Sequence, residues 1–143
     1  MRVVCDTNIL ARCFPNQSGP SRRLLDALFF GEEHVLVISP EILDELEETL
    51  AYPRIRRRWA TTPEAVSRYR SALERFSHVV EAARGPRIVP GDPDDDVVIY
   101  TAIAGRADVI CTRDQHLLQP DVLAFCQRRG LRVMSDLEIL AEL

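Results

Sequence analysis

The chain has 143 residues, of which 46% are hydrophobic and 28% are charged. This length and composition are typical of one globular domain with a substantial core, so we expect residues 1–143 to form a single domain. The formal net charge of −4 argues against a protein that holds polyanions through bulk positive charge. All 18 basic residues are arginine, which excludes sites that require a lysine, such as the P-loop and the Schiff-base enzymes.

The cysteines stand apart in the sequence, without a Cys-x-x-Cys pair or a histidine at zinc-finger spacing. They are Cys5, Cys13, Cys111 and Cys126. We therefore expect buried, reduced thiols in a cytoplasmic protein rather than disulfides or a zinc site. The N-terminus has no secretory pattern, and no apolar run reaches the ~20 residues that span a bilayer, so we expect no membrane association.

The first half of the chain alternates short apolar runs with helical patterns. We expect strands at residues 2–6 and 34–39, and helices at 9–14, 22–30, 41–51 and 63–79. Asp6, Thr7 and Asn8 follow the first strand and are residue types that cap helices. Ser39 occupies the same position after the second strand, and Pro40 takes the favoured first position of its helix.

The second half continues the same alternation. We expect strands at residues 87–89, 108–111 and 132–134, with helices beginning near Asp96 and at 121–129 and 136–143. Alternating strands and helices indicate a parallel sheet with helices on both faces. The predicted fold class is α/β, a three-layer α/β/α arrangement with a central, mainly parallel sheet.

Several acidic residues fall at the same end of this predicted sheet. Asp6 ends the first strand, Asp114 follows the fourth, and the acidic run 92–96 precedes the helix between the third and fourth strands. Parallel α/β folds place their ligands outside the carboxyl ends of the strands. We therefore expect carboxylates from distant parts of the sequence to meet at this edge.

Crowded carboxylates raise each other's pKa and cost stability unless a cation neutralises them. All-oxygen sites suit Mg²⁺ or Mn²⁺, and such an ion can activate a water and stabilise displacement at phosphorus. A phosphodiesterase of this kind needs no serine, cysteine, lysine or histidine nucleophile. The complete lack of lysine is compatible with that chemistry.

Four segments, VVCDTN, SPEILDEL, DPDDDVVIYTAI and ADVICTRD, occur in this order over nearly the whole chain. They resemble the signature segments of PIN-domain ribonucleases. Within that family the chain is most similar to the VapC-like toxin components of bacterial toxin–antitoxin systems. The resemblance implies a PIN-like fold, hydrolysis of RNA with Mg²⁺ or Mn²⁺, an antitoxin partner and a homodimer.

The resemblance also implies roles for particular residues. Four acids would form the catalytic and metal-binding quartet, namely Asp6, Glu45, Asp96 and Asp114. Three polar residues would support them by orienting carboxylates and water, namely Thr7, Asn8 and Thr112. On this hypothesis Asp96→Asn would relieve repulsion and leave the fold as stable as before or more so.

The residues alone leave alternatives for several of these positions. Asp92 before Pro93 is typical of a helix cap, and Asp94 and Asp95 would favour the positive end of the helix dipole. Periodicity cannot choose between Glu45 and Glu47, which flank opposite sides of the apolar stripe of their helix. His34, His78 and His116 are scattered, so we expect no catalytic histidine.

A basic segment lies between the third and fourth predicted helices of the first half, at residues 54–59. It contains Arg54, Arg56, Arg57, Arg58 and Trp59. These residues could contact an RNA backbone and stack on a base, as in single-strand binders. A solvated helix face, an oligomer contact and a docking site for an acidic antitoxin segment fit the same pattern.

The favoured hypothesis is a metal-dependent endoribonuclease that acts as the toxin of a toxin–antitoxin pair. The alternative is a catalytically weak PIN-like module that binds RNA or protein. A phosphoacceptor or phosphatase of another doubly wound fold is disfavoured, because receiver-like sites need a lysine and dehalogenase-like sites need an Asp where Asn8 stands.

Overall fold

The computed structural model describes residues 1–143 and contains five strands and eight helices. The strands are β1 (Arg2–Cys5), β2 (Val35–Ile38), β3 (Ser77–Val79), β4 (Val109–Cys111) and β5 (Arg132–Met134). The helices are α1 (Thr7–Arg12), α2 (Pro20–Phe30), α3 (Pro40–Ala51), α4 (Pro53–Trp59), α5 (Pro63–Phe76), α6 (Pro93–Ala104), α7 (Pro120–Gln127) and α8 (Asp136–Glu142). Most elements lie within two or three residues of their predicted positions.

The five strands form one parallel sheet in the order β3-β2-β1-β4-β5. β1 is central, and the chain first builds outward to β3 before crossing back to β4. This confirms the predicted α/β class with a central parallel sheet. Because all strands run the same way, their carboxyl ends share one edge.

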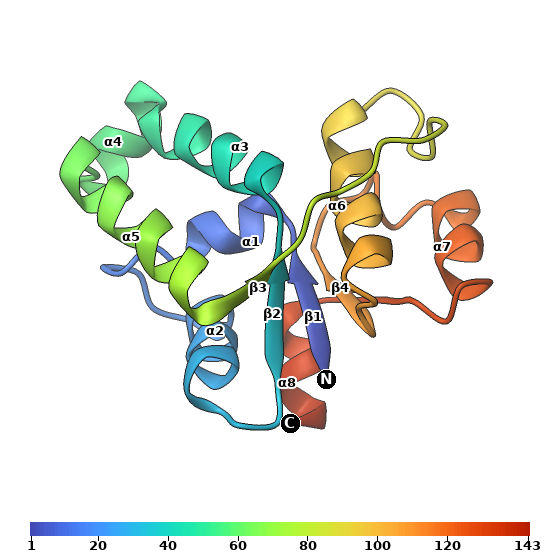
Figure 1. Cartoon of the computed structure of the whole chain (residues 1–143). Helices are drawn as coiled ribbons and strands as arrows, with labels where there is room; N and C mark the ends of the chain where they lie inside the picture. Colours follow the sequence, from blue (N-terminus) through green and yellow to red (C-terminus); the bar gives the residue numbers. More distant parts are fainter.

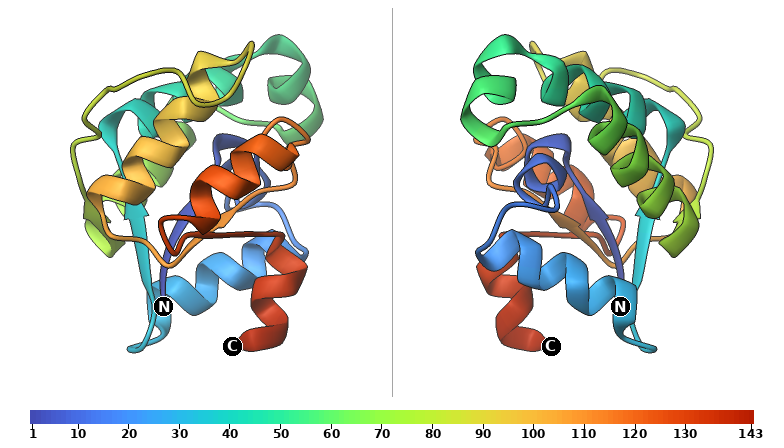
Figure 2. Two further views of the ribbon diagram at one scale, coloured as in Figure 1. Left: turned by 90° about the vertical axis from the view of Figure 1, so that its right-hand side faces the viewer. Right: turned by 90° about the vertical axis from the view of Figure 1, so that its left-hand side faces the viewer.

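Helices cover both faces of the sheet (Figures 1 and 2). α6 and α7 lie on one side, and α1 to α5 lie on the other, where α8 packs against α2. The N-terminal ends of α1, α3 and α6 lie beside the carboxyl edge of the sheet (Figure 1). This edge therefore receives side chains from three helices as well as from the strand ends.

One continuous core of 32 buried hydrophobic residues fills the space between these layers. The central strands are apolar on both faces, with Val3, Val4, Val109 and Ile110 fully enclosed. Gly105 ends α6 against β2, and a Cβ there would lie 2.3 Å from a methyl carbon of Val37. None of the eight helices combines the length and the apolarity that crossing a bilayer requires.

Two sequence predictions are wrong, namely the position of the third strand and the end of the helix predicted at residues 63–79, which corresponds to α5. α5 stops at Phe76, and residues 77–79, predicted as helix, form the edge strand β3 beside β2. Residues 87–89, predicted as that strand, lie outside the sheet. The backbone N–H groups of Ile88 and Val89 donate instead to the Asp96 carboxylate. The apolar run at 87–89 thus covers the start of α6 instead of extending the sheet.

A candidate metal centre at the carboxyl edge of the sheet

Asp6 lies at the end of β1 and caps α1. Its Oδ1 accepts a hydrogen bond from the Ile9 N–H at 2.8 Å, and its Oδ2 accepts one from the Thr112 hydroxyl. Only 4% of Asp6 is exposed, and burial raises the pKa of its carboxyl group although both hydrogen bonds act in the opposite direction. The residue caps the helix and faces the acidic cluster at the same time.

Asp114 reaches the same place from β4. The pairing of Cys5 with Cys111 sets the ends of β1 and β4 side by side, so the turn after β4 meets Asp6. Thr112 joins the two acids, because its hydroxyl donates to Asp6 and accepts from the Asp114 N–H at 2.9 Å. The supporting role of Thr112 in the proposed site stays a prediction.

Glu45 extends from α3 toward Asp6. The Thr7 hydroxyl donates to Glu45 Oε2 at 2.9 Å, and burial, followed by the charges of Asp94, Asp92 and Asp6, raises the Glu45 pKa. Glu47 turns to the other side of the helix, where its carboxylate lies 3.5 Å from Arg70. The structure therefore resolves the choice that periodicity left open and places Glu45 at the cluster.

The first turn of α6 contributes Asp92 and Asp95. Asp92 caps the helix, with its Oδ1 accepting the Asp94 N–H at 3.0 Å, as the sequence predicted. Asp95 is 7% exposed, and its Oδ2 is buried without a hydrogen-bond partner. Burial and then the charges of Asp114 and Asp92 raise the Asp95 pKa to about 8.

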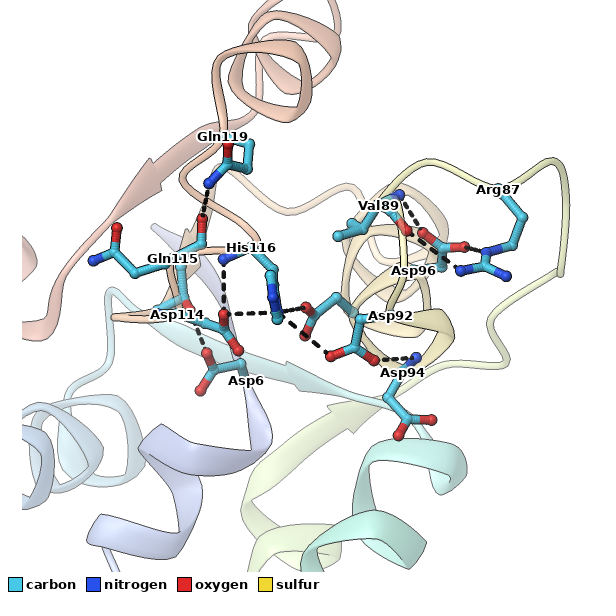
Figure 3. Close-up of polar contacts among 12 residues, drawn as sticks. Asp6, Arg87, Val89, Asp92, Asp94, Asp96, Asp114, Gln115, His116 and Gln119 are labelled. Atoms are coloured by element: carbon cyan, nitrogen blue, oxygen red, sulfur yellow. Dashed lines mark hydrogen bonds and ion pairs between the residues drawn. The ribbon is translucent and has the colours of Figure 1, made fainter.

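Asp96 does not face the other acids, and its predicted place in the quartet is wrong. Its Oδ1 accepts from the Ile88 and Val89 N–H groups at 3.1 and 2.6 Å, and its Oδ2 lies 3.0 Å from Arg87 Nε. Figure 3 shows Asp96 directed toward Arg87 and Val89, away from Asp6 and Asp114. Successive helical residues diverge by about 100°, so only one of Asp95 and Asp96 can face the cluster.

His116 is a site residue that the sequence reasoning missed. Its Nδ1 lies 3.7 Å from Asp92, 3.6 Å from Asp95 and 3.4 Å from Asp114. Figure 3 shows His116 between Asp92 and Asp114. One ligand atom from each of Asp92, Asp95 and His116 fits within 4.8 Å. The only signal in the sequence was its position two residues after Asp114, at the predicted carboxyl edge.

The donor set fits a divalent cation. The buried carboxylates of Asp6 and Asp95 lie near the partly exposed Asp114, and Asp95 Oδ2 has no hydrogen-bond donor from the protein. Buried carboxylates without a positive partner are costly, and hard oxygen ligands suit Mg²⁺ and Mn²⁺. The residues that would hold the ion are Asp6, Asp95 and Asp114, with Asp92, Glu45 and His116 around them.

A cleft opens beside this cluster and runs along α1 and α4. It is lined by Asn8, Arg12, Arg54, Arg58, Trp59, Arg113 and Asp114, among others. Arg54 and Arg58 are one helical turn apart and share a face of α4. Arg56 instead lines a recess between α3 and α5, and Arg57 lines neither. The basic segment is thus divided, and only part of it faces the acids.

Comparison with known proteins identifies the family of the chain. A sequence profile described as "PIN domain" matches residues 2–116. The chain belongs to the PIN-domain family. No curated protein sequence matches it. Among solved structures, this PIN domain is similar in fold to a chain from the crystal structure of VapBC2 from Rickettsia felis bound to a DNA fragment from their promoter. The TM-score is 0.54 with 15% identity, covering 93% of this chain and 98% of that one.

The two neighbouring aspartates of α6 should respond oppositely to amide substitution. In metal-free buffer, Asp95→Asn should raise the free energy of unfolding by about 1 kcal/mol, because it removes a crowded, unpartnered charge. Asp96→Asn should lower it by about 1 to 3 kcal/mol, because an amide NH2 would face Arg87 in place of Oδ2, and because the acceptor of the Ile88 and Val89 N–H groups would lose its charge. Urea unfolding of the two variants and the wild type measures both effects. Destabilisation by both substitutions would contradict the assignment of Asp95 to the acidic cluster and of Asp96 to the contacts with residues 87–89.

The advantage of Asp95→Asn should depend on pH. Because the Asp95 pKa is raised from 3.8 in the unfolded chain to about 8, the folded state keeps a proton that the unfolded state loses across this interval. Rising pH therefore removes stability from the wild type but not from the variant. The gap between their unfolding free energies should widen from pH 5 to pH 8 in metal-free buffer. A constant gap would show that Asp95 does not titrate in this way.

Proposed function

We propose that this PIN domain is a metal-dependent endoribonuclease and the toxin component of a toxin–antitoxin pair. The observation that carries the proposal is the buried, unpartnered Asp95 carboxylate beside Asp6 and Asp114. This arrangement is costly in an empty protein and favourable around a divalent ion. Membership in the PIN-domain family supports nuclease chemistry at the same site.

A bound Mg²⁺ or Mn²⁺ would supply water activation and charge stabilisation at the phosphodiester. The residues of the chain hold the acids in position for this task. The Ile9 N–H and Thr112 fix both oxygens of Asp6, and Thr7 fixes Glu45. Asn8 stands at the entrance of the cleft that leads to Asp114. None of these supporting residues is a lysine, and none is a serine.

The cleft beside the cluster supports RNA as the substrate. Arg12, Arg54 and Arg58 line the cleft together with Asp114 and supply positive charge, and Trp59 adds an aromatic ring to its lining. Phosphates held by arginines and bases stacked on aromatic rings are the usual means of binding single strands. Arg113 is committed elsewhere, since its guanidinium makes two hydrogen bonds with Asp136 at 2.8 and 2.7 Å.

The toxin role rests on the same family membership and on the fold shared with a chain of the VapBC2 complex. We propose that an antitoxin covers the acidic cluster or the cleft and that the PIN domain is a homodimer. A protein acting on RNA in this way would work in the cytoplasm, where its four free, buried cysteines stay reduced.

Cleavage of single-stranded RNA should require the ion and the cluster. With Mn²⁺ the wild type should cut a labelled RNA, and EDTA should stop it. Asp6→Asn and Asp95→Asn should each reduce the rate by at least about 100-fold, because they remove metal-ligand charge. Asp121→Asn, an exposed residue in the first turn of α7, is the matched control and should retain the wild-type rate. Metal-dependent binding without any cleavage would instead favour a binding module.

The arginines of α4 should differ in their contribution to RNA binding. Arg54→Ala and Arg58→Ala should weaken binding and each reduce the slope of log K against log salt by about 1. Arg57→Ala removes the same charge from the same helix outside the cleft and should have a much smaller effect. Fluorescence anisotropy at several salt concentrations measures these slopes. Equal losses from all three variants would mean that general charge, not the cleft, binds RNA.

A further inference from the structure

A second recess lies on the opposite side of the first turn of α6 from the acidic cluster. It is enclosed by the N-terminal turn of α3, residues 82–87 and α6, and it has a volume of about 90 Å³. This is room for several water molecules, or for a small planar group that enters from solvent. Nothing in the proposed chemistry at Asp6 and Asp114 uses this recess.

Glu41 supplies the acceptor in this recess. Its Oε2 is buried and has no hydrogen-bond donor within the protein. The last torsion of a glutamate side chain is soft, so the carboxylate can turn its oxygens toward a ligand in the recess. Glu41 precedes Glu45 by about one helical turn on α3, about 6 Å along its axis. The unpartnered carboxylate therefore lies one turn from the proposed catalytic acids.

The walls of the recess are held in place before any ligand arrives. Tyr100 donates its hydroxyl to the Pro86 carbonyl at 2.6 Å, and a Cβ on Gly85 would lie 2.5 Å from that hydroxyl oxygen. Asp96 ties the same loop to α6 through two backbone N–H groups and Arg87. The role of Asp96 is thus to shape this recess, where it lines the wall.

We propose that this recess binds a guanine base of the RNA substrate, with Glu41 accepting from its Watson–Crick edge. Guanine is the RNA base with two adjacent donors, N1–H and the N2 amine, which match the two oxygens of a carboxylate. Tyr100 provides an aromatic wall, and the exposed guanidinium of Arg84 at the mouth is suited to a phosphate. The proposal deepens the proposed ribonuclease function by assigning a base preference next to the cut.

Other occupants match the recess less well. Adenine and cytosine place an acceptor beside their donor, and uracil has a single donor between two acceptors, so each would face Glu41 with repulsion. A guanidinium from a partner protein also carries paired donors. The recess is lined by two carboxylates, Glu41 and Asp96, and by two guanidinium groups, Arg84 and Arg87, so its formal charges sum to zero. The lining therefore favours a neutral base over a basic side chain.

Equilibrium binding of free mononucleotides tests the recess independently of cleavage. GMP should bind the wild type roughly tenfold more tightly than IMP, which lacks the N2 amine, and more tightly than AMP. Glu41→Gln should abolish the preference for GMP, because the NH2 group of the glutamine amide is a donor and would face a donor of the guanine base. Glu48→Gln, an exposed change on the same helix, should leave it intact. Chemical shifts of the backbone amides near Tyr100 report the binding site and confirm that each variant is folded.

The outcomes separate this proposal from the proposed function. GMP selectivity that depends on Glu41 supports the recess even if RNA is never cut. Cleavage with no guanine preference, unchanged by Glu41→Gln, would overturn the recess proposal and leave the ribonuclease standing. Equal binding of GMP, IMP and AMP would overturn it, and so would binding of arginine amide at the recess in place of GMP.

Discussion

Repulsion among buried carboxylates is the constraint on which the carboxyl edge of this sheet depends. Asp6, Asp95 and Asp114 come from the end of β1, from α6 and from the turn after β4, and burial removes much of the hydration of Asp6 and Asp95. No arginine forms an ion pair with any of them, and the imidazole of His116 lies 3.6 Å from Asp95 and 3.4 Å from Asp114. A protein that keeps such a cluster loses stability unless a cation enters it.

The parallel sheet holds these carboxylates in fixed positions despite their repulsion. Parallel pairing of β1 with β4 fixes the distance between Asp6 and Asp114, and the Thr112 hydroxyl binds both strands' ends together. The first turn of α6 directs different aspartates to its two sides. One face of its first turn presents Asp92 and Asp95 to the cluster, while Asp96 on the other face organises residues 87–89. Adjacent aspartates of one sequence run thus face the acidic cluster and the loop at residues 87–89.

Much of this arrangement could be predicted from the sequence. Apolar runs alternating with capped helices indicate the parallel sheet, and the sheet brings Asp6 and Asp114 to one edge. The helical phase of the acidic run could not be predicted, since Asp92, Asp95 and Asp96 all lie within one turn and tertiary packing decides which faces inward. Helical periodicity likewise could not choose between Glu45 and Glu47. In the structure Thr7 donates a hydrogen bond to Glu45, and Arg70 lies beside Glu47. β3 was missed because SHV is too short and polar to differ from a helix end.

Calorimetric titration of Mn²⁺ tests the central claim most directly, because it measures whether the crowded acids bind a cation without requiring any substrate. The account predicts one saturable binding event in the wild type, retained in Asp96→Asn if that variant is folded, and lost or weakened at least tenfold in Asp95→Asn. Mn²⁺ should also raise the unfolding temperature of the wild type, since a ligand of the folded state stabilises it. Equal Mn²⁺ affinity in the wild type and Asp95→Asn would contradict the claim that the crowded acids bind the cation.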